Sequence, residues 1–284
     1  MQKNPYRVWR WSALLNGIKE INKGDCITLI IEELTEEIKL EIRQQLVEIC
    51  HGKANADSTA KAYSYKSTVK EFIKRYKESP DRNNTRNKGM IGELLFHVIF
   101  NTYKKYVPIS AFFNLEERSF KKGFDSSYYA VDSDQLWIAE VKSGEKQKSQ
   151  ATASAAMVGL LNTTKNDLKD RFTSENNSLW LNAINHARIA MSESKDEKKA
   201  VISLLEKYSD DAEIEKYISQ DKNVILVGVL FNPIEEKVDC VKVEAKHNRV
   251  ASEKLFASLI TVAIQKSTYD AVYRFLESEA NDGE

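Results

Sequence analysis

The sequence predicts an α/β fold, and three observations support this prediction. Continuous apolar runs typical of buried strands, such as NVILVGVLFN at 223–232, alternate with segments of helical periodicity. The chain has 284 residues, of which 42% are hydrophobic, so it can bury a sizeable core in one large or two small domains. This composition excludes disordered and fibrous proteins.

The N-terminal part, residues 1–60, is predicted to be a small α+β unit. A strand is expected at 27–31, followed by a helix at 35–50 that begins at Thr35. The segment HGKANADSTAKA at 51–62 is rich in small and polar residues, which favours a loop. We therefore place a domain boundary near residue 60, with the second domain at 61–284.

The middle of the chain predicts a buried helix followed by a meander of three short strands. The segment GMIGELLFHVIFNTY, which begins at Gly89, is apolar nearly all round, as expected of a buried helix. The segments at 112–120, 124–131 and 135–143 (FFNLEERSF, FDSSYYAV and QLWIAEVKS) resemble strands, and the last two are separated by turn-forming residues.

The C-terminal part predicts helices alternating with strands. Helices are expected at 151–171 and 180–190, and a helical insertion is expected around 160–220. A buried strand is expected at 223–232. An alternating strand at 238–246 and a last helix at 252–276 complete the expected elements.

Charge is balanced overall but not locally. The 42 Lys and Arg residues equal the 42 Asp and Glu residues, so no global positive field attracts nucleic acid or a membrane. The stretch 61–88 nevertheless carries nine basic and three acidic residues, interleaved with aromatic side chains. It is either a solvated helix face or a surface that contacts nucleic acid. The stretch 193–221 has nine acidic and five basic residues and is either a solvated helix pair or a partner-facing surface.

The sequence argues against membrane, secreted and zinc-binding proteins. The chain has no apolar run long enough to span a membrane and no apolar segment of a secretory signal near its start, so we expect a cytosolic protein. Cys26, Cys50 and Cys240 are far apart and lack the spacing of a zinc site, so we expect reduced, buried thiols. Hydrolytic chemistry, if present, would depend on carboxylates.

One group of residues could carry such chemistry. A strand at 135–143 places Glu140 and Lys142 side by side on one face. Pairing with the preceding strand brings Asp125 toward Glu140. The two carboxylates and the backbone carbonyl of Val141 form a plausible Mg²⁺ site, in which Mn²⁺ could substitute. Lys142 would orient or deprotonate water, and Glu93 on the buried helix could complete the metal or water shell.

This pattern resembles the PD-(D/E)xK nuclease superfamily, whose core is a helix, a three-stranded meander, a helix and a further strand. Phe124 replaces the proline of the family name. The strings KGMIGELLFHVI, KKGFD and LWIAEVKS further resemble the HamA family, nuclease subunits of the bacterial Hachiman anti-phage defence system. The resemblance covers Glu93, Asp125, Glu140 and Lys142. It implies a bacterial DNA nuclease held by a helicase partner, HamB.

Other interpretations stay open from the sequence. An acid-x-Lys triplet arises by chance in so charged a chain, and Glu140 with Lys142 could be a solvated cross-strand charge pair. Glu93 could pair with His97 one helical turn away. The protein could instead be a nucleic-acid-binding or scaffold subunit with a vestigial site, or a nuclease directed at RNA.

Overall fold

The computed structural model describes residues 15–78, 84–103, 105–111, 124–173, 177–191, 196–214 and 218–282. Its strands are β1 (Ile18–Lys23), β2 (Cys26–Ile31), β3 (Tyr106–Pro108), β4 (Ser126–Ala130), β5 (Gln135–Glu145), β6 (Asn223–Phe231) and β7 (Ser258–Lys266). Its helices are α1 (Glu36–His51), α2 (Lys53–Ala56), α3 (Tyr65–Lys77), α4 (Thr85–Asn101), α5 (Ala153–Thr173), α6 (Asn177–Ala190), α7 (Asp196–Glu213), α8 (Cys240–Ser252) and α9 (Asp270–Asn281), with a 3₁₀ turn η1 (Lys61–Tyr63).

The described strands form one mixed sheet in the order β1-β2-β7-β6-β5-β4-β3. The four central strands, β2, β7, β6 and β5, are mutually parallel, and the strands at both edges are antiparallel to their neighbours. Parallel strands need crossover connections, and α5, α6 and α7 lie in the connection between β5 and β6. The α/β class predicted from the sequence is therefore confirmed.

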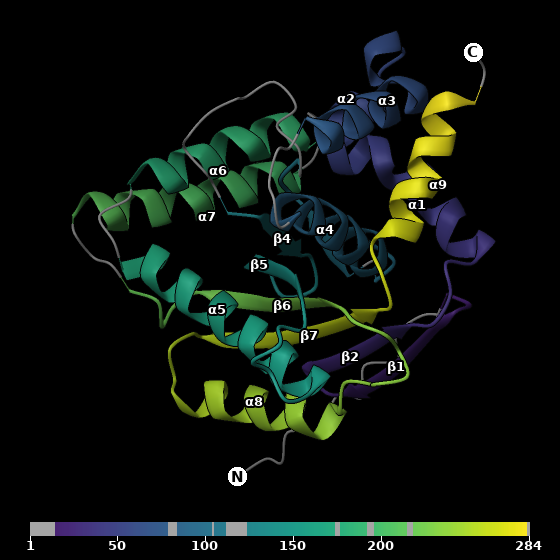
Figure 1. The fold of residues 1–284 in the computed structure, drawn as a ribbon. Coiled ribbons are helices and arrows are strands. Elements are labelled where there is room, and N and C mark those ends of the chain that lie inside the picture. Colours follow the sequence, from purple (N-terminus) through teal and green to yellow (C-terminus); the bar gives the residue numbers. More distant parts are fainter. Residues whose placement is uncertain are drawn as a thin grey trace.

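Helices cover both faces of this sheet, with α1, α3, α4 and α9 on one face and α5, α6, α7 and α8 on the other (Figure 1). Each parallel strand contributes alternate residues to the two cores. On β5, for example, Ala139 and Val141 pack under α4, whereas Leu136 and Ile138 face α5. The sheet is thus buried on both sides, which explains its continuous apolar strands.

Helix α4, strands β3, β4 and β5, helix α5 and strand β6 follow one another in this order, with α6 and α7 between α5 and β6. The expected strand at 112–120 lies outside the described residues. The described first strand of the meander is instead β3, which pairs antiparallel with β4. The turn between β4 and β5 falls at residues 131–134, as predicted.

Two C-terminal predictions are wrong. Residues 238–246 do not form a strand, because helix α8 begins at Cys240 and the Asp239 side chain caps its N-terminus by accepting a hydrogen bond from the Val241 N–H, at 2.9 Å. The buried residues of α8, Val243 and Val250, are seven apart, which is a helical repeat.

The predicted helix at 252–276 is also wrong, because it merges a strand with the start of a helix. Residues 258–266 form β7, and the alternating β-branched side chains Ile260, Val262 and Ile264 pack into one core from this strand. The last helix, α9, begins only at Asp270.

The N-terminal elements belong to the same sheet as the rest of the chain. β2 pairs in parallel with β7, and the sequence analysis did not identify its partner β1. The predicted helix at 35–50 is confirmed as α1, with the Thr35 side chain as its N-cap. The boundary predicted near residue 60 therefore separates two segments that share one sheet.

The basic stretch 61–88 is partly neutralised by neighbouring acids. Lys77 pairs with Glu277 on α9 at 2.8 Å, and Arg75 pairs with Glu71 at 2.9 Å. Phe72 is completely buried, so it is a core residue and not a platform for stacked bases. Whether the remaining surface contacts nucleic acid stays a prediction, as does a partner for the acidic stretch 193–221.

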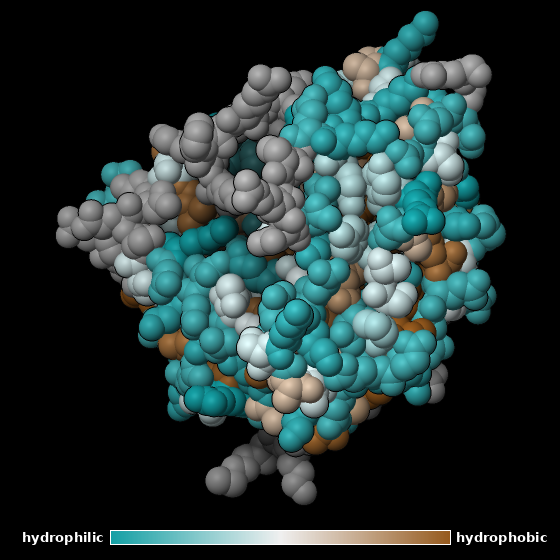
Figure 2. Space-filling model, in the orientation of Figure 1, coloured by the Kyte–Doolittle hydropathy of each residue, from teal (hydrophilic) through white to brown (hydrophobic). Residues whose placement is uncertain are grey.

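The surface is mainly hydrophilic on the face shown in Figure 2, where hydrophobic residues are scattered. Within the described part of the chain, we find no helix of sufficient length and hydrophobicity to span a bilayer. Cys26 and Cys50 are free and buried as predicted, whereas Cys240, at the start of α8, is only half-buried.

Candidate active site

Strand β5 places Glu140 and Lys142 on the face of the sheet that α5 covers. Their side chains alternate with Ala139 and Val141, which pack under α4 on the other face. The Glu140 side chain is 0% exposed, and its Oε1 accepts a hydrogen bond from Lys142 Nζ at 2.9 Å. A solvated surface charge pair, the alternative considered from the sequence, is therefore wrong.

Asp125 lies beside Glu140, at the point where β4 and β5 separate. The register pairs Ser126 with Ala139, so Asp125 precedes the first paired residue of β4. Its Oδ2 accepts a hydrogen bond from the backbone N–H of Val141 at 3.0 Å. Because the N–H and C=O groups of one strand residue point to the same side, the Val141 carbonyl lies on this edge of β5 too.

Helix α5 adds two charged residues that the sequence analysis did not identify. Asp167 Oδ2 lies 2.7 Å from Lys142 Nζ, and Arg171 Nη1 lies 3.1 Å from Glu140 Oε2. Asp167 and Arg171 are four residues apart and therefore lie on one helix face. That spacing in the predicted helix at 151–171 was the available signal, but many charged pairs in this chain share it.

The surroundings of Glu140 and Lys142 raise the pKa values of both side chains. Burial and the nearby charge of Asp125 raise the pKa of Glu140 to about 7, although Arg171 and Lys142 oppose the rise. Burial alone would lower the pKa of Lys142, but Glu140 and Asp167 outweigh that effect and hold it above its ordinary value. Lys142 is thus a permanent cation, which suits orienting water better than deprotonating it.

Glu93 comes from a different helix than Asp167 and Arg171. It is half-buried on α4, the helix that covers the opposite face of β5 from Glu140 and Lys142. The ring nitrogens of His97, one turn later, bond to Ser126 Oγ at 2.6 Å and Tyr128 OH at 2.9 Å. The structure brings Asp125, Glu140, Val141 and Lys142 together, and the role of Glu93 stays a prediction.

The donor atoms fit a hard divalent cation. Glu140 Oε2 is buried and accepts no hydrogen bond from the described residues, although Arg171 Nη1 lies 3.1 Å from it, so this oxygen can serve as a ligand. Mg²⁺ commonly binds through one or two carboxylates and keeps several waters. No group of three or more His, Cys, Asp or Glu side chains in the described residues is arranged to hold a metal ion. Two carboxylates and a carbonyl are therefore the protein ligands to consider.

A family model identifies the chain. The model of the HamA family matches residues 12–279, which is nearly the whole sequence. The chain belongs to the HamA family. A search of curated protein sequences finds no match. Membership of the HamA family implies a role in the Hachiman anti-phage defence system, as the sequence motifs suggested.

The HamA match extends far beyond the motifs that suggested it. Those motifs lie between residues 88 and 143, whereas the matched region includes the whole described sheet and both helical layers. Asp125, Glu140, Lys142, Asp167 and Arg171 all lie within the matched region, and α5 and β5 together form the candidate site.

Proposed function

We propose that this HamA-family protein is a Mg²⁺-dependent DNA nuclease of the PD-(D/E)xK type, the effector of a bacterial cytoplasmic defence complex. The observation that carries the proposal is the buried Glu140 carboxylate, with Asp125 beside it and Lys142 bonded to it. A structural ion pair needs no second carboxylate that raises the pKa of the first. A cation site benefits from a second carboxylate, because the repulsion between the two carboxylates is relieved when the cation binds.

The residues have separate roles in this proposal. Asp125, Glu140 and the Val141 carbonyl would hold Mg²⁺, with Mn²⁺ as a substitute and Glu93 as a possible contributor to the water shell. The bound cation would supply stabilisation of the charge that develops on the phosphate and on the leaving oxygen. Lys142, held by Glu140 and Asp167, would orient the attacking water and add positive charge beside the phosphate.

Helix α5 fixes this geometry. Arg171 contacts Glu140 and Asp167 contacts Lys142, so both charged residues of β5 are held from the same helix. Catalytic groups need such support, because small displacements of a reacting group cost much of its effect. The α5 pair would therefore position Glu140 and Lys142 without touching the substrate bond.

DNA and a HamB-like helicase are the proposed partners. The chain has no net charge, and part of its basic stretch is neutralised by α9. Affinity for DNA depends strongly on phosphate contacts by basic residues. We expect the protein alone to bind DNA weakly at physiological salt and to depend on the helicase for delivery. A nanomolar complex between the isolated protein and DNA would contradict this expectation.

One observation favours a second candidate, a scaffold subunit with a vestigial site. Four charged side chains of the site already pair with one another, as expected of a structural ion-pair network: Glu140, Lys142, Asp167 and Arg171. The two candidates differ in a cleavage assay with Mg²⁺ or EDTA, with and without the helicase and ATP. Metal-dependent cleavage that is lost in Glu140→Gln supports the nuclease. DNA binding that survives loss of Glu140 and Lys142, with no cleavage under any condition, supports the scaffold. An RNA substrate in the same assay separates the two nucleic acids.

A further inference from the structure

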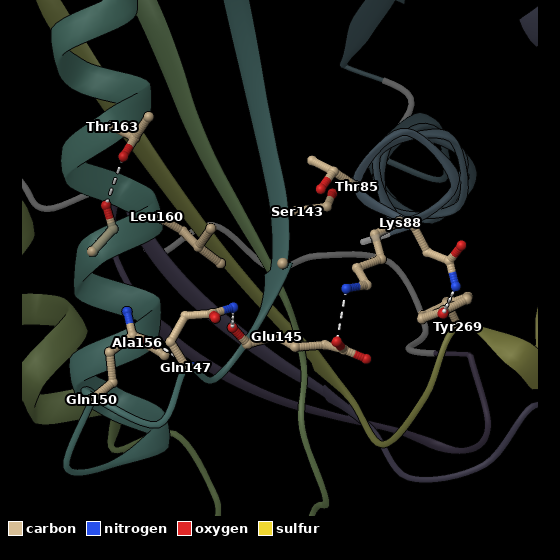
Figure 3. Close-up of a pocket in the computed structure, with 13 residues that line it drawn as sticks. Thr85, Lys88, Ser143, Glu145, Gln147, Gln150, Ala156, Leu160, Thr163 and Tyr269 are labelled. Carbon is tan, nitrogen blue, oxygen red and sulfur yellow. Dashed lines mark hydrogen bonds and ion pairs between the residues drawn. The ribbon is translucent and has the colours of Figure 1, made fainter. Parts of the chain in front are cut away.

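A cleft of about 700 Å³ lies between α4 and α5, along the end of β5 (Figure 3). It begins next to the candidate site, because Ser143 follows Lys142 on β5 and Thr163 lies one turn before Asp167 on α5. Among the described residues, the β5 segment beyond Ala139 pairs only with β6, so its other edge faces the cleft.

Among the described residues, the lining of this cleft is polar and its charges balance. Its charged side chains are Lys88 and Glu145, and Lys88 Nζ lies 2.7 Å from Glu145 Oε2, so their charges cancel. The rest of the lining is mainly hydroxyl and amide groups, with the Tyr269 ring at one side. Such a surface suits uncharged groups with hydrogen-bond donors and acceptors, and it offers little to a phosphate.

Gly159 leaves space on the side of the cleft that α5 lines. A Cβ atom at Gly159 would lie 3.4 Å from Gln150 Nε2, so the missing side chain leaves space around this amide. The Gln150 Oε1 accepts a hydrogen bond from the Gln147 backbone N–H at 2.7 Å, which fixes the orientation of the amide. The amide therefore lines an open space instead of packing against a side chain.

We propose that this cleft binds the unpaired bases of a single DNA strand whose scissile phosphate lies beside Lys142. The inference rests on the proposed nuclease function and names its substrate class as single-stranded DNA. Nucleobases are uncharged, carry donors and acceptors on their edges and stack on aromatic rings, which matches the amides, hydroxyls and Tyr269 of the lining.

The distribution of charge agrees with this assignment. The charged side chains of Lys142, Arg171, Glu140 and Asp167 pair with one another just beyond one end of the cleft, where the phosphate would lie beside Lys142, and the charge-balanced lining begins at Ser143. Bases inside a duplex are paired and stacked, so each would have to be extruded to enter the cleft. An unwound strand presents its bases without that cost.

Binding measured without metal tests the inference independently of cleavage. Fluorescence anisotropy of the full chain in EDTA would compare a labelled single strand, the matching duplex and an oligomer of abasic residues with the same number of phosphates. We expect the single strand to bind at least about tenfold more tightly than the other two, a difference of about 1.4 kcal/mol, which one stacked base can supply. Equal affinity for all three would overturn the inference, whether or not the protein cleaves DNA.

Variants that fill the cleft complete the test. Gly159→Leu projects a side chain toward Gln150, and leucine is a better helix former than glycine, so α5 is retained. Thr163→Leu changes a second, exposed position of the same wall. Both should weaken single-strand binding about tenfold and leave the weak duplex binding unchanged. Ser203→Leu on the exposed face of α7 is the matched control and should change neither affinity. Unchanged single-strand affinity in both cleft variants would contradict the proposal.

Discussion

Arg171 Nη1 lies 3.1 Å from Oε2 of Glu140, a carboxylate with 0% of its side chain exposed. The two residues come from different layers, Arg171 from α5 and Glu140 from β5. Lys142 on β5 and Asp167 on α5 connect the same two layers, with Nζ 2.7 Å from Oδ2. The candidate site is therefore built by two ion pairs between one helix and one strand.

Removing Arg171 should destabilise the protein through Glu140. Arg171→Met leaves a buried carboxylate without one of its cations, which costs about 2–4 kcal/mol of unfolding free energy. In a Glu140→Gln background the same substitution should cost much less, because the buried charge is absent. Urea unfolding of the two single variants and the double variant measures the difference, and additive costs would show that the pair is not coupled.

The pH dependence of stability should report the Glu140 carboxyl. Its folded pKa, about 7, is above the ordinary value of 4.5, so its contribution to stability is greatest below pH 4.5 and is lost as pH rises through 7. The stability of wild type relative to Glu140→Gln should fall by about 3 kcal/mol across this window.

Unfolding in EDTA from pH 4.5 to 8 tests this prediction, because every titratable group other than Glu140 is present in both proteins. A constant difference between wild type and Glu140→Gln would contradict the raised pKa.

Mg²⁺ should stabilise the folded protein through Asp125 and Glu140. A ligand that binds only the folded state raises the unfolding temperature with its concentration. We expect such a rise with MgCl₂ in wild type and its loss in Asp125→Asn, which removes one charged ligand but retains an acceptor for the Val141 N–H. KCl at the same ionic strength is the control for screening. An equal rise in Asp125→Asn would exclude Asp125 as a ligand.

The packing of α4 on β5 should depend on Gly92. A Cβ atom there would lie 1.9 Å from Ser143 Oγ and 2.8 Å from Ser143 Cβ, so helix and strand must separate if it is added. Gly92→Ala should lower the unfolding free energy by about 1–3 kcal/mol, as overpacking does. Ser143→Gly in the same chain should recover much of that loss, as judged by thermal unfolding. If Ser143→Gly does not recover the lost stability, the strain does not arise from the contact between Gly92→Ala and Ser143.

The sequence predicted the parts of the fold that local patterns determine. The alternation in QLWIAEVKS correctly placed Glu140 and Lys142 on one face, and the turn before it brought Asp125 alongside. The segment 238–246 misled because valine spacing alone does not distinguish a strand from a helix whose N-cap is Asp239.

Contacts between the helical layers and the sheet could not be predicted from the sequence. Asp167 and Arg171 resemble many other charged pairs until α5 is placed over β5. The position of α4 on the opposite face of β5 from Glu140 also depends on how the layers assemble. These features follow from tertiary packing, whereas periodicity describes one segment at a time.

Cleavage of linear and supercoiled DNA by wild type and by the Glu140→Ala, Lys142→Ala double variant tests the central claim most directly. Each protein would be assayed with Mg²⁺ or EDTA, alone and with the helicase partner and ATP. The proposed function predicts Mg²⁺-dependent cleavage by wild type that the double variant loses while remaining folded. Equal cleavage by both proteins would contradict a nuclease site at Glu140 and Lys142, and DNA binding without cleavage under every condition would favour the scaffold.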